Sequence, residues 1–192
     1  MAKPGERKLQ ILQTLAEMLE APQAEKITTA ALAARIGVSE AALYRHFASK
    51  AQMYEGLIEF IESTLFSLIN RIGADEPLGL EQVRATAQLL LGFAERNRGM
   101  CRVLTGEVLV NEHTRLQARV NQLLDRIEAS LRQSLRIAAT QGAVAAGNET
   151  ACANLVLTAI LGRMQQFVKS GFTRMPLEHW PAQWAVLTRG AA

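Results

Sequence analysis

Cysteine is scarce in this chain of 192 residues, which contains only Cys101 and Cys152, far apart and without a CxxC pattern. So few cysteines exclude a disulfide-stapled scaffold and are typical of reduced thiols in a cytoplasmic protein. The three histidines, His46, His113 and His179, are equally scattered, and no two have the spacing of metal ligands on a helix. We therefore expect no metal site and no cofactor.

Long apolar runs are also absent, since no stretch approaches the roughly 18 residues that a membrane span requires. The N-terminal sequence MAKPGERKLQ is charged and precedes no apolar segment, so it predicts no secretory signal. Hydrophobic residues make up 49% and charged residues 20% of the chain, a balance typical of one globular unit or two small ones. We expect a cytoplasmic protein without a membrane segment.

The chain lacks the usual residue combinations of enzymes: a Ser/His/Asp arrangement, paired carboxylates, a glycine-rich phosphate loop or a metal motif. An enzyme is therefore not expected. An excess of one charge is missing too, because the net charge is only +3. Residues 1–50 hold seven Lys or Arg against five Asp or Glu. This balance is compatible with nucleic-acid binding and equally with ordinary surface charge.

Apolar residues do recur at spacings of three and four along nearly the whole chain, and no segment alternates as a strand would. The sequence therefore predicts an all-α fold of about nine helices. Gly73 and Pro77 are expected to end the fourth helix. The expected helices span residues 7–20, 29–36, 40–46, about 50–72, 80–97, 99–106, 111–140, 149–170 and 179–188.

Residues 28–52 contain several helix-capping signals. Thr28 and Ser39 can cap the second and third helices, and Gly37 between them suits a left-handed turn. Ser49 and Gln52 form a capping box for the fourth helix, in which the Gln52 side chain is expected to reach back to Ser49. Two short helices joined by a glycine-containing turn predict a helix-turn-helix at about residues 28–47.

The predicted motif divides its residues between two faces. Its inward set is Leu32, Ile36, Val38, Leu43 and Phe47, and its outward set is Tyr44, Arg45, His46 and Lys50. The outward groups suit phosphate oxygens and base edges, whereas a plain three-helix bundle would need all these signals to coincide by accident. Glu40 is awkward on such a face. It either stabilises its helix N-terminus or discourages wrong sites from the groove edge.

The run TTAALAARIGVSEAALYRHFASK resembles the DNA-binding sequence of TetR-type repressors. This resemblance implies a TetR-like fold, with a three-helix DNA-binding domain at 1–50 and a helical dimerisation and partner-binding domain at 51–192. TetR-type dimers bind near-palindromic double-stranded DNA with half-sites about 34 Å apart. By position, and from the hydroxyls that open the second helix, we expect DNA contacts from Thr28, Thr29, Ser39, Ala41, Ala42, Tyr44, Arg45, His46 and Lys50.

The fourth and fifth helices carry more apolar residues than one face needs. Phe60 and Phe66 lie off the main stripe of the fourth helix, and a second stripe on the fifth includes Leu89, Gly92 and Arg96. One interpretation is a fifth helix buried all round, with Gly92 at a tight helix crossing. The other is a groove between the two helices that receives a partner peptide.

Three further runs resemble the SlmA nucleoid-occlusion factors, a specialised TetR-type group: GLIEFIE (56–62), LLLGFAERNRGMCRVLTGE (89–107) and RLQARVNQLLDRIEASLRQSLR (115–136). The resemblance implies a nucleoid-associated cell-division protein that, bound at chromosomal sites, disrupts polymers of the GTPase FtsZ and so prevents Z-ring assembly over the nucleoid. By position, it implies that the FtsZ C-terminal tail binds Phe60, Leu89, Gly92, Arg96 and Asn97. Leu68 departs from the group, which tends to have a basic residue there.

The eighth helix is apolar around most of its girth, and the ninth offers a matching face, as in a four-helix bundle between two chains. We expect a homodimer whose interface includes Leu155, Ile160, Met164, Phe167, Trp180 and Trp184, with the number of dimers per DNA site left open. The alternative function is a ligand-responsive TetR-type transcriptional repressor. Few aromatic residues lie in the middle of the chain, which argues against a ligand pocket there.

Overall fold

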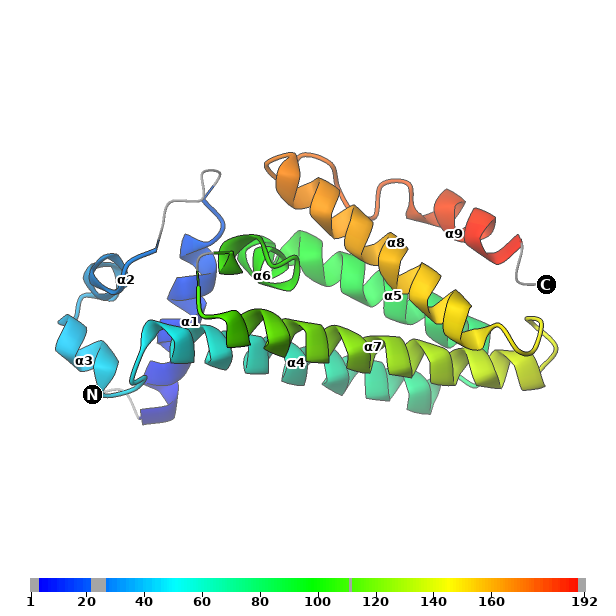
Figure 1. Cartoon of the computed structure of the whole chain (residues 1–192), viewed down its shortest axis with the longest axis horizontal. Coiled ribbons are helices and arrows are strands. Elements are labelled where there is room, and N and C mark those ends of the chain that lie inside the picture. The colour runs from blue at the N-terminus through cyan, green and yellow to red at the C-terminus, as the bar shows by residue number, and fades with distance from the viewer. Residues whose placement is uncertain (1–3, 22–26, 111, 190–192) are drawn as a thin grey trace. The chain divides into compact units, whose positions relative to one another are not determined.

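The computed structural model describes residues 4–21, 27–110 and 112–189. Over these residues the protein has nine α-helices, one 3-10 turn (η1) and no strand, which confirms the predicted all-α fold (Figure 1). None of the described helices is long and apolar enough to cross a membrane. The elements are α1 (Pro4–Met18), α2 (Thr29–Ile36), α3 (Glu40–Tyr44), α4 (Lys50–Asp75), α5 (Gly79–Arg96), α6 (Arg98–Leu104), η1 (Glu107–Leu109), α7 (Thr114–Thr140), α8 (Glu149–Lys169) and α9 (Trp180–Arg189).

Most helix ends lie within three residues of their predicted positions, but the predicted end of α4 at Gly73 is wrong. The helix continues to Asp75, and the N–H of Glu76 still donates to the carbonyl of Ile72 at 3.0 Å. A glycine inside a helix costs only about 1 kcal/mol relative to alanine. One exposed glycine is too small a cost to stop the helix, so α4 continues past Gly73 and ends shortly before Pro77.

The capping box of α4 differs from the prediction in one bond. The N–H of Gln52 donates to the Ser49 hydroxyl at 3.2 Å, as predicted. The Gln52 side-chain carbonyl, however, accepts from the N–H of Ala48 at 2.9 Å. The box therefore also ties down the residue before the cap, which fixes the chain direction into α4.

The chain divides into two compact units, and each is described by itself. The first comprises Met1–Ile61 and Asn97–Val120, and the second Glu62–Arg96 and Asn121–Ala192. The helix-turn-helix belongs to the first unit, whereas α5, α8 and α9 belong to the second. This division does not follow the chain order, because residues 97–120 return to the N-terminal unit.

In the first unit, α6 packs directly on the backbone of α1. A Cβ at Gly99 would lie 2.0 Å from the Ala16 carbonyl oxygen, so only glycine permits this approach. The buried Arg102 guanidinium donates to the carbonyls of Leu19 at 3.1 Å and Ala21 at 2.7 Å, just beyond the end of α1. α6 therefore fixes the position of α1 by a glycine contact and an arginine cap.

The two cysteines are free thiols in the structure. Cys101 is fully buried on α6, and this burial, helped by the negative charge of Glu107, raises its thiol pKa to about 12. Cys152 is half-buried on α8.

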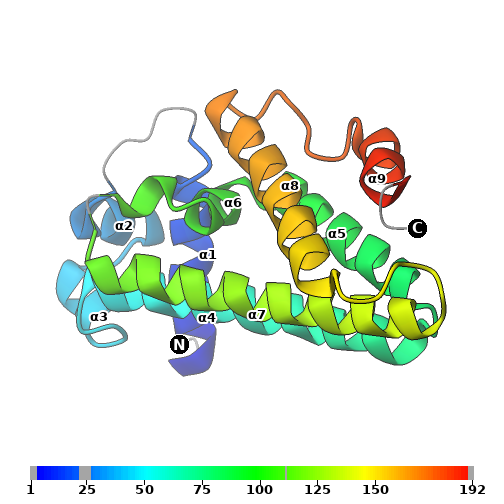
Figure 2. The same ribbon diagram turned by 45° about the vertical axis from the view of Figure 1, so that its right-hand side comes forward.

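In the second unit, α5 is buried along most of its length, and α8 crosses it in both views (Figures 1 and 2). Near the start of α5, a Cβ at Gly79 would lie 2.3 Å from the backbone nitrogen of Ala138 on α7, so these two helices touch through their backbones. Gln141 bridges the chain before α5, accepting from the Gly79 N–H and donating to the Pro77 carbonyl. The second unit is therefore built around α5.

Candidate nucleic-acid interface and partner surfaces

The helix-turn-helix adopts the local geometry that its sequence predicts. Thr28 caps α2 by accepting a hydrogen bond from the backbone N–H of Ala31 at 3.1 Å. Ser39 caps α3 in the same way, accepting from Ala42 at 3.3 Å. Gly37 has a φ of 74°, which suits glycine, and its N–H closes the end of α2. The caps and the turn fix where both short helices begin and how they are joined.

The residues predicted to contact DNA all lie in the first unit, and none of them is buried. Thr28, Ser39, Ala41, Tyr44 and Arg45 are exposed, whereas Thr29, Ala42, His46 and Lys50 are half-buried. Of the predicted inward set, Leu32, Leu43 and Phe47 are buried and Ile36 and Val38 half-buried. The residues predicted to contact DNA are thus accessible and lie within one unit, while the contacts with DNA stay predictions.

Glu40, the acidic residue on this face, has a partner within the motif. Its carboxylate accepts a hydrogen bond from the Thr29 hydroxyl at 2.7 Å, and the Tyr44 hydroxyl lies 3.4 Å from the same Thr29 oxygen. The carboxylate therefore links the first turns of α2 and α3 and sets the direction of the Thr29 hydroxyl. The sequence alone left the role of Glu40 open and did not show that it lies beside two predicted DNA contacts.

Lys50, at the first turn of α4, is already engaged within the protein. Its ammonium group forms an ion pair with Glu112, and it lies 5.6 Å from the centre of the Tyr54 ring. The two charged side chains are only 22% and 15% exposed. Burial, followed by the charge of Glu112, raises the pKa of the Tyr54 hydroxyl well above its usual range. A predicted phosphate contact thus has an internal carboxylate partner.

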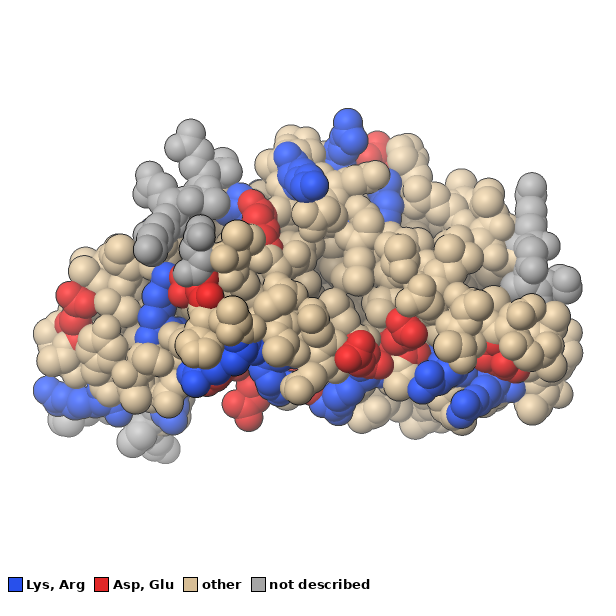
Figure 3. Space-filling view, viewed as in Figure 1, with Lys and Arg blue, Asp and Glu red and all other residues tan. Residues whose placement is uncertain are grey.

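Charge around the motif is mixed rather than of one sign. Lys, Arg, Asp and Glu are interspersed over the side of the protein shown in Figure 3, in keeping with a net charge of +3. A net charge this small implies only modest long-range attraction of DNA, so the local contacts predicted for Arg45 and Lys50 would matter most.

A groove between α4 and α5 lies within the second unit. It has a volume of about 370 Å³. The lining residues are Leu68, Arg71, Ile72 and Asp75 on α4, Glu76 just after α4, and Ala85 and Leu89 on α5. Leu89 is one of the predicted FtsZ-binding residues, and Leu68, 38% exposed, is the residue that departs from the SlmA pattern. An apolar floor with an Arg71–Asp75 ion pair at its edge suits an extended peptide.

α5 is largely buried, but one side of it, which includes Ala85, Leu89 and Arg96, is half-buried or exposed. Gly92 does not mark a helix crossing. The nearest atoms to a Cβ there would be the Arg96 guanidinium, at 3.3 Å, and the Leu177 side chain, at 3.7 Å. Leu177 is held in place because its N–H donates to the Glu95 carboxylate at 2.7 Å. Gly92 therefore gives Arg96 and the segment before α9 room to lie on α5.

The predicted FtsZ-binding residues divide between the two units. Gly92 and Arg96 lie together on α5, and Leu89 lines the groove on the same helix. Phe60 and Asn97, both half-buried, belong to the first unit. The second unit thus contributes Leu89, Gly92 and Arg96 to this predicted site.

Most of the residues predicted at the dimer interface are buried inside the chain itself. Ile160, Met164, Phe167, Trp180 and Trp184 are between 0% and 9% exposed, whereas Leu155 is 53% exposed. The aromatic members pack within the second unit: the ring of Phe167 contacts Phe172, and Trp180 contacts Trp184. Their apolar character on α8 and α9 is explained by this core.

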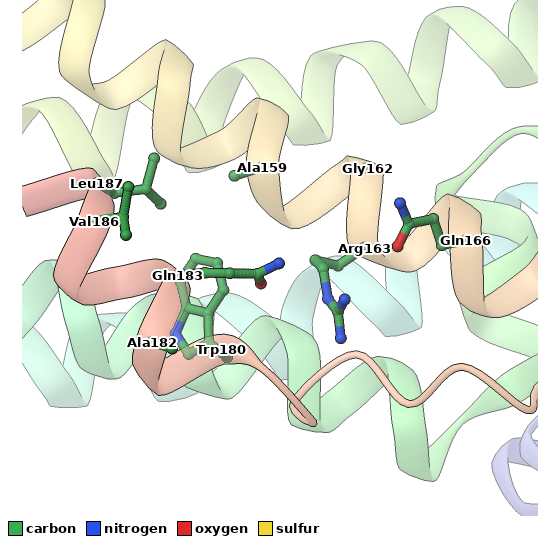
Figure 4. A pocket seen from close by; sticks show the side chains of 9 residues that line it. All are labelled: Ala159, Gly162, Arg163, Gln166, Trp180, Ala182, Gln183, Val186 and Leu187. Atoms are coloured by element: carbon green, nitrogen blue, oxygen red, sulfur yellow. The ribbon is translucent and has the colours of Figure 1, made fainter.

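The open apolar face between α8 and α9 has other residues. A groove of about 490 Å³ runs along both helices (Figure 4) and is lined by Ala159, Gly162, Arg163, Gln166, Trp180, Ala182, Gln183, Val186 and Leu187. Gly162 has no atom within 4 Å of where a Cβ would be, and Val186 is 68% exposed. Among the described residues, buried Trp180 Nε1 and Gln183 Oε1 find no hydrogen-bond partner. This face is suited to a second polypeptide.

Comparison with known proteins identifies the family. Residues 11–57 match the family of bacterial regulatory proteins called tetR, and residues 79–191 match the SlmA-like family described as tetracyclin repressor-like, C-terminal domain. The chain is 50% identical over 188 residues to nucleoid occlusion factor SlmA from a Marinomonas species, covering 97% of this chain and 95% of that protein. The chain belongs to the SlmA group of the TetR family. It is also 52% identical over 182 residues to SlmA from Idiomarina loihiensis, covering 94% of this chain and 93% of that protein.

The fold of this SlmA-group chain is shared with distant TetR-type regulators. A regulator from Haloarcula marismortui superposes with a TM-score of 0.82 at 15% identity, covering 97% of this chain and 98% of that one. The fatty acid degradation regulator FadR from Bacillus halodurans superposes with a TM-score of 0.81 at 13% identity, covering 95% and 98%. At such identities the likeness concerns the fold alone, and it confirms the predicted TetR-like architecture.

Two functional positions in this SlmA-group chain escaped sequence reasoning. Glu112 reaches Lys50 across 62 positions, and Arg102 reaches the end of α1 across more than 80. Glu112 belongs to no periodic pattern or motif, and the run 89–107 that contains Arg102 does not indicate what its side chain contacts. A lone acid and a lone arginine give no local signal, so only the folded chain reveals their partners.

Proposed function

We propose that the protein is a DNA-dependent antagonist of FtsZ that acts at the nucleoid as a homodimer. The observation that carries this proposal is identity of about 50% to curated nucleoid occlusion factors over nearly the full length of both proteins. Residues 1–50 supply the DNA-binding domain and residues 51–192 the dimerisation and partner-binding domain. The activity is binding and polymer disruption, without a catalysed reaction.

DNA recognition in this proposal rests on the exposed helix-turn-helix face. Arg45 offers a guanidinium for phosphate or guanine, and Ala41 and Ala42 are small enough to admit a thymine methyl group. The capped N-termini of α2 and α4 offer backbone N–H groups to phosphates. Near-palindromic sites follow from a two-fold dimer, in which each chain contributes one such face.

FtsZ recognition rests on the groove that Leu68, Ile72 and Leu89 line in the second unit. An extended tail gains affinity by burying apolar side chains there, and Arg96, exposed on the same helix, suits carboxylates of the peptide. The family resemblance implies that Phe60, in the first unit, also contacts FtsZ. Leu68 adds apolar area where related proteins tend to have a positive charge.

Dimerisation in this proposal uses the open α8–α9 face rather than the buried aromatic residues. Leu155, Gly162 and Val186 supply accessible apolar or small surface, and the open space at Gly162 permits close approach of a partner helix.

The proposal is tested by sedimenting FtsZ polymers with GTP in the presence of the protein and its specific DNA. We expect loss of polymer mass that depends on DNA. Leu89→Glu places a charge in the groove and should weaken this antagonism at least about tenfold, while DNA binding survives.

Leu78→Glu is the matched control, because Leu78 is 53% exposed and does not line the groove. Unchanged FtsZ polymers with the wild-type protein and DNA would refute the proposal. Release from DNA by a small metabolite would instead support a ligand-responsive repressor. The small cavity that Val83, Val156 and Trp184 help to line offers only about 30 Å³ for such a molecule.

A further inference from the structure

The ion pair between Lys50 and Glu112 joins two segments that are far apart in sequence. Lys50 opens α4, directly after the Ser49 cap, and Glu112 lies shortly before α7 begins at Thr114. Both residues belong to the first unit, which also contains the helix-turn-helix. The contact therefore joins the start of α4 to the segment between η1 and α7.

This ion pair is shielded from solvent more than an ordinary surface pair. The side chains of Lys50 and Glu112 are 22% and 15% exposed, and the ammonium group also lies near the face of the Tyr54 ring. A partly buried pair is screened less by salt than an exposed one. A DNA phosphate must therefore interact with Lys50 more favourably than Glu112 does in order to displace it.

The same ammonium group stands where a phosphate would bind. The N-terminus of a helix attracts anions through its free N–H groups, and Lys50 occupies the first turn of α4. One ammonium cannot satisfy a partly buried carboxylate and a DNA phosphate with the same strength at the same time. Separating Lys50 from Glu112 therefore adds a cost to DNA binding.

We infer that Glu112 competes with the DNA backbone for Lys50 and thereby lowers the affinity of the protein for DNA. The inference rests on the proposed role of Lys50 as a phosphate contact. DNA gains the Lys50 charge only by displacing Glu112, so the carboxylate restrains binding at weak sites. The two events are linked reciprocally. A contact that holds Glu112 away from Lys50 strengthens DNA binding, and DNA binding strengthens that contact by the same factor.

The Glu55–Arg115 ion pair provides a matched control. It also joins α4 to the start of α7 within the first unit, with a distance of 2.7 Å between Arg115 Nε and Glu55 Oε1. Glu55→Gln and Glu112→Gln each remove one carboxylate and free one cation. Only Glu112→Gln frees a cation that is proposed to bind DNA.

The experiment measures DNA affinity by fluorescence anisotropy across a range of salt concentrations, together with thermal unfolding of the free protein. Glu112→Gln should bind DNA roughly threefold to tenfold more tightly than Glu55→Gln. The same variant should unfold at a lower temperature, because it loses a partly buried ion pair. A merely structural role would lower both stability and DNA affinity.

Lys50→Ala completes a double-mutant cycle. It should reduce the slope of log affinity against log salt by about 0.9 per protomer, the value for one phosphate contact. In the Lys50→Ala background, Glu112→Gln should gain no more affinity than Glu55→Gln. The advantage of Glu112→Gln thus requires Lys50.

The outcomes separate the inference from the function on which it rests. If Lys50→Ala lowers the salt slope but Glu112→Gln binds no better than Glu55→Gln, the competition is overturned and the DNA contact stands. If Lys50→Ala leaves affinity and slope unchanged, the phosphate contact itself fails, and the competition fails with it.

Discussion

Glu40 illustrates how a single residue acquires meaning from its neighbours. In the sequence it is an acid on a face meant for phosphates. In the structure its carboxylate holds the Thr29 hydroxyl, close to the Tyr44 hydroxyl. We expect a negative charge there to repel phosphates that come close to it, and the hydrogen bond to orient the Thr29 hydroxyl.

Replacing this carboxylate should reduce discrimination between DNA sequences. Glu40→Gln removes the charge and keeps the shape, so affinity for random duplex should rise by roughly twofold to tenfold. Affinity for the specific site should rise less, because Thr29 is held less firmly. Competition anisotropy with specific and random duplexes measures the ratio. An unchanged ratio would contradict the role assigned to Glu40, and Glu55→Gln controls for charge alone.

At the scale of elements, α6 and α1 touch through their backbones in the first unit. Gly99 allows the two backbones to touch, and Arg102 satisfies carbonyls at the end of α1. These contacts join the first DNA-binding helix to a segment about 80 residues later. The helix-turn-helix therefore depends for its support on residues outside the N-terminal 50.

Gly99→Ala should destabilise the protein, because the new methyl group would meet the Ala16 carbonyl oxygen. The backbone cannot move aside cheaply, so we expect a loss of about 1–3 kcal/mol and a lower Tm in thermal unfolding followed by circular dichroism. Gly73→Ala is the control, since nothing lies within 4 Å of a Cβ there. In α4 it should stabilise by about 0.4–1 kcal/mol. Equal effects of both variants would contradict the proposed packing.

At the scale of the whole molecule, the second unit separates its core from its open face. The aromatic residues Phe167, Trp180 and Trp184 are buried in the chain, while Leu155 and Val186 remain accessible. The proposed association through α8 and α9 would therefore add to an existing core and need not complete one. A stable folded monomer is expected when the open face is altered.

Val186→Asp should convert dimers to folded monomers, because Val186 is 68% exposed on the open face. A charge at the centre of an apolar interface typically costs more than about 2 kcal/mol, which shifts the dissociation constant more than about thirtyfold. Analytical ultracentrifugation over a concentration series measures this shift. Val110→Asp, at a position 78% exposed in the first unit, should leave the dimer intact. A Val186→Asp dimer of normal affinity would place the interface elsewhere.

The sequence by itself determined the helices, the caps at Thr28 and Ser39, and the turn at Gly37, because each depends on hydrogen bonds between residues a few positions apart. It also indicated the family, since the motif and the later runs are contiguous. The expectation failed at Gly73, because a single glycine costs a helix only about 1 kcal/mol and α4 continues past it.

Only the tertiary structure decided which side of α8 faces the core, what covers Gly92, and which carboxylate holds Lys50. An apolar α8 is equally consistent with burial in its own chain or in a dimer. The packing of α8 on α5 shows that Ile160 is buried in its own chain. Lys50 and Glu112 lie 62 positions apart, and no periodicity relates them. Such contacts arise when separate helices pack together, so their partners are set by the fold and not by neighbouring residues.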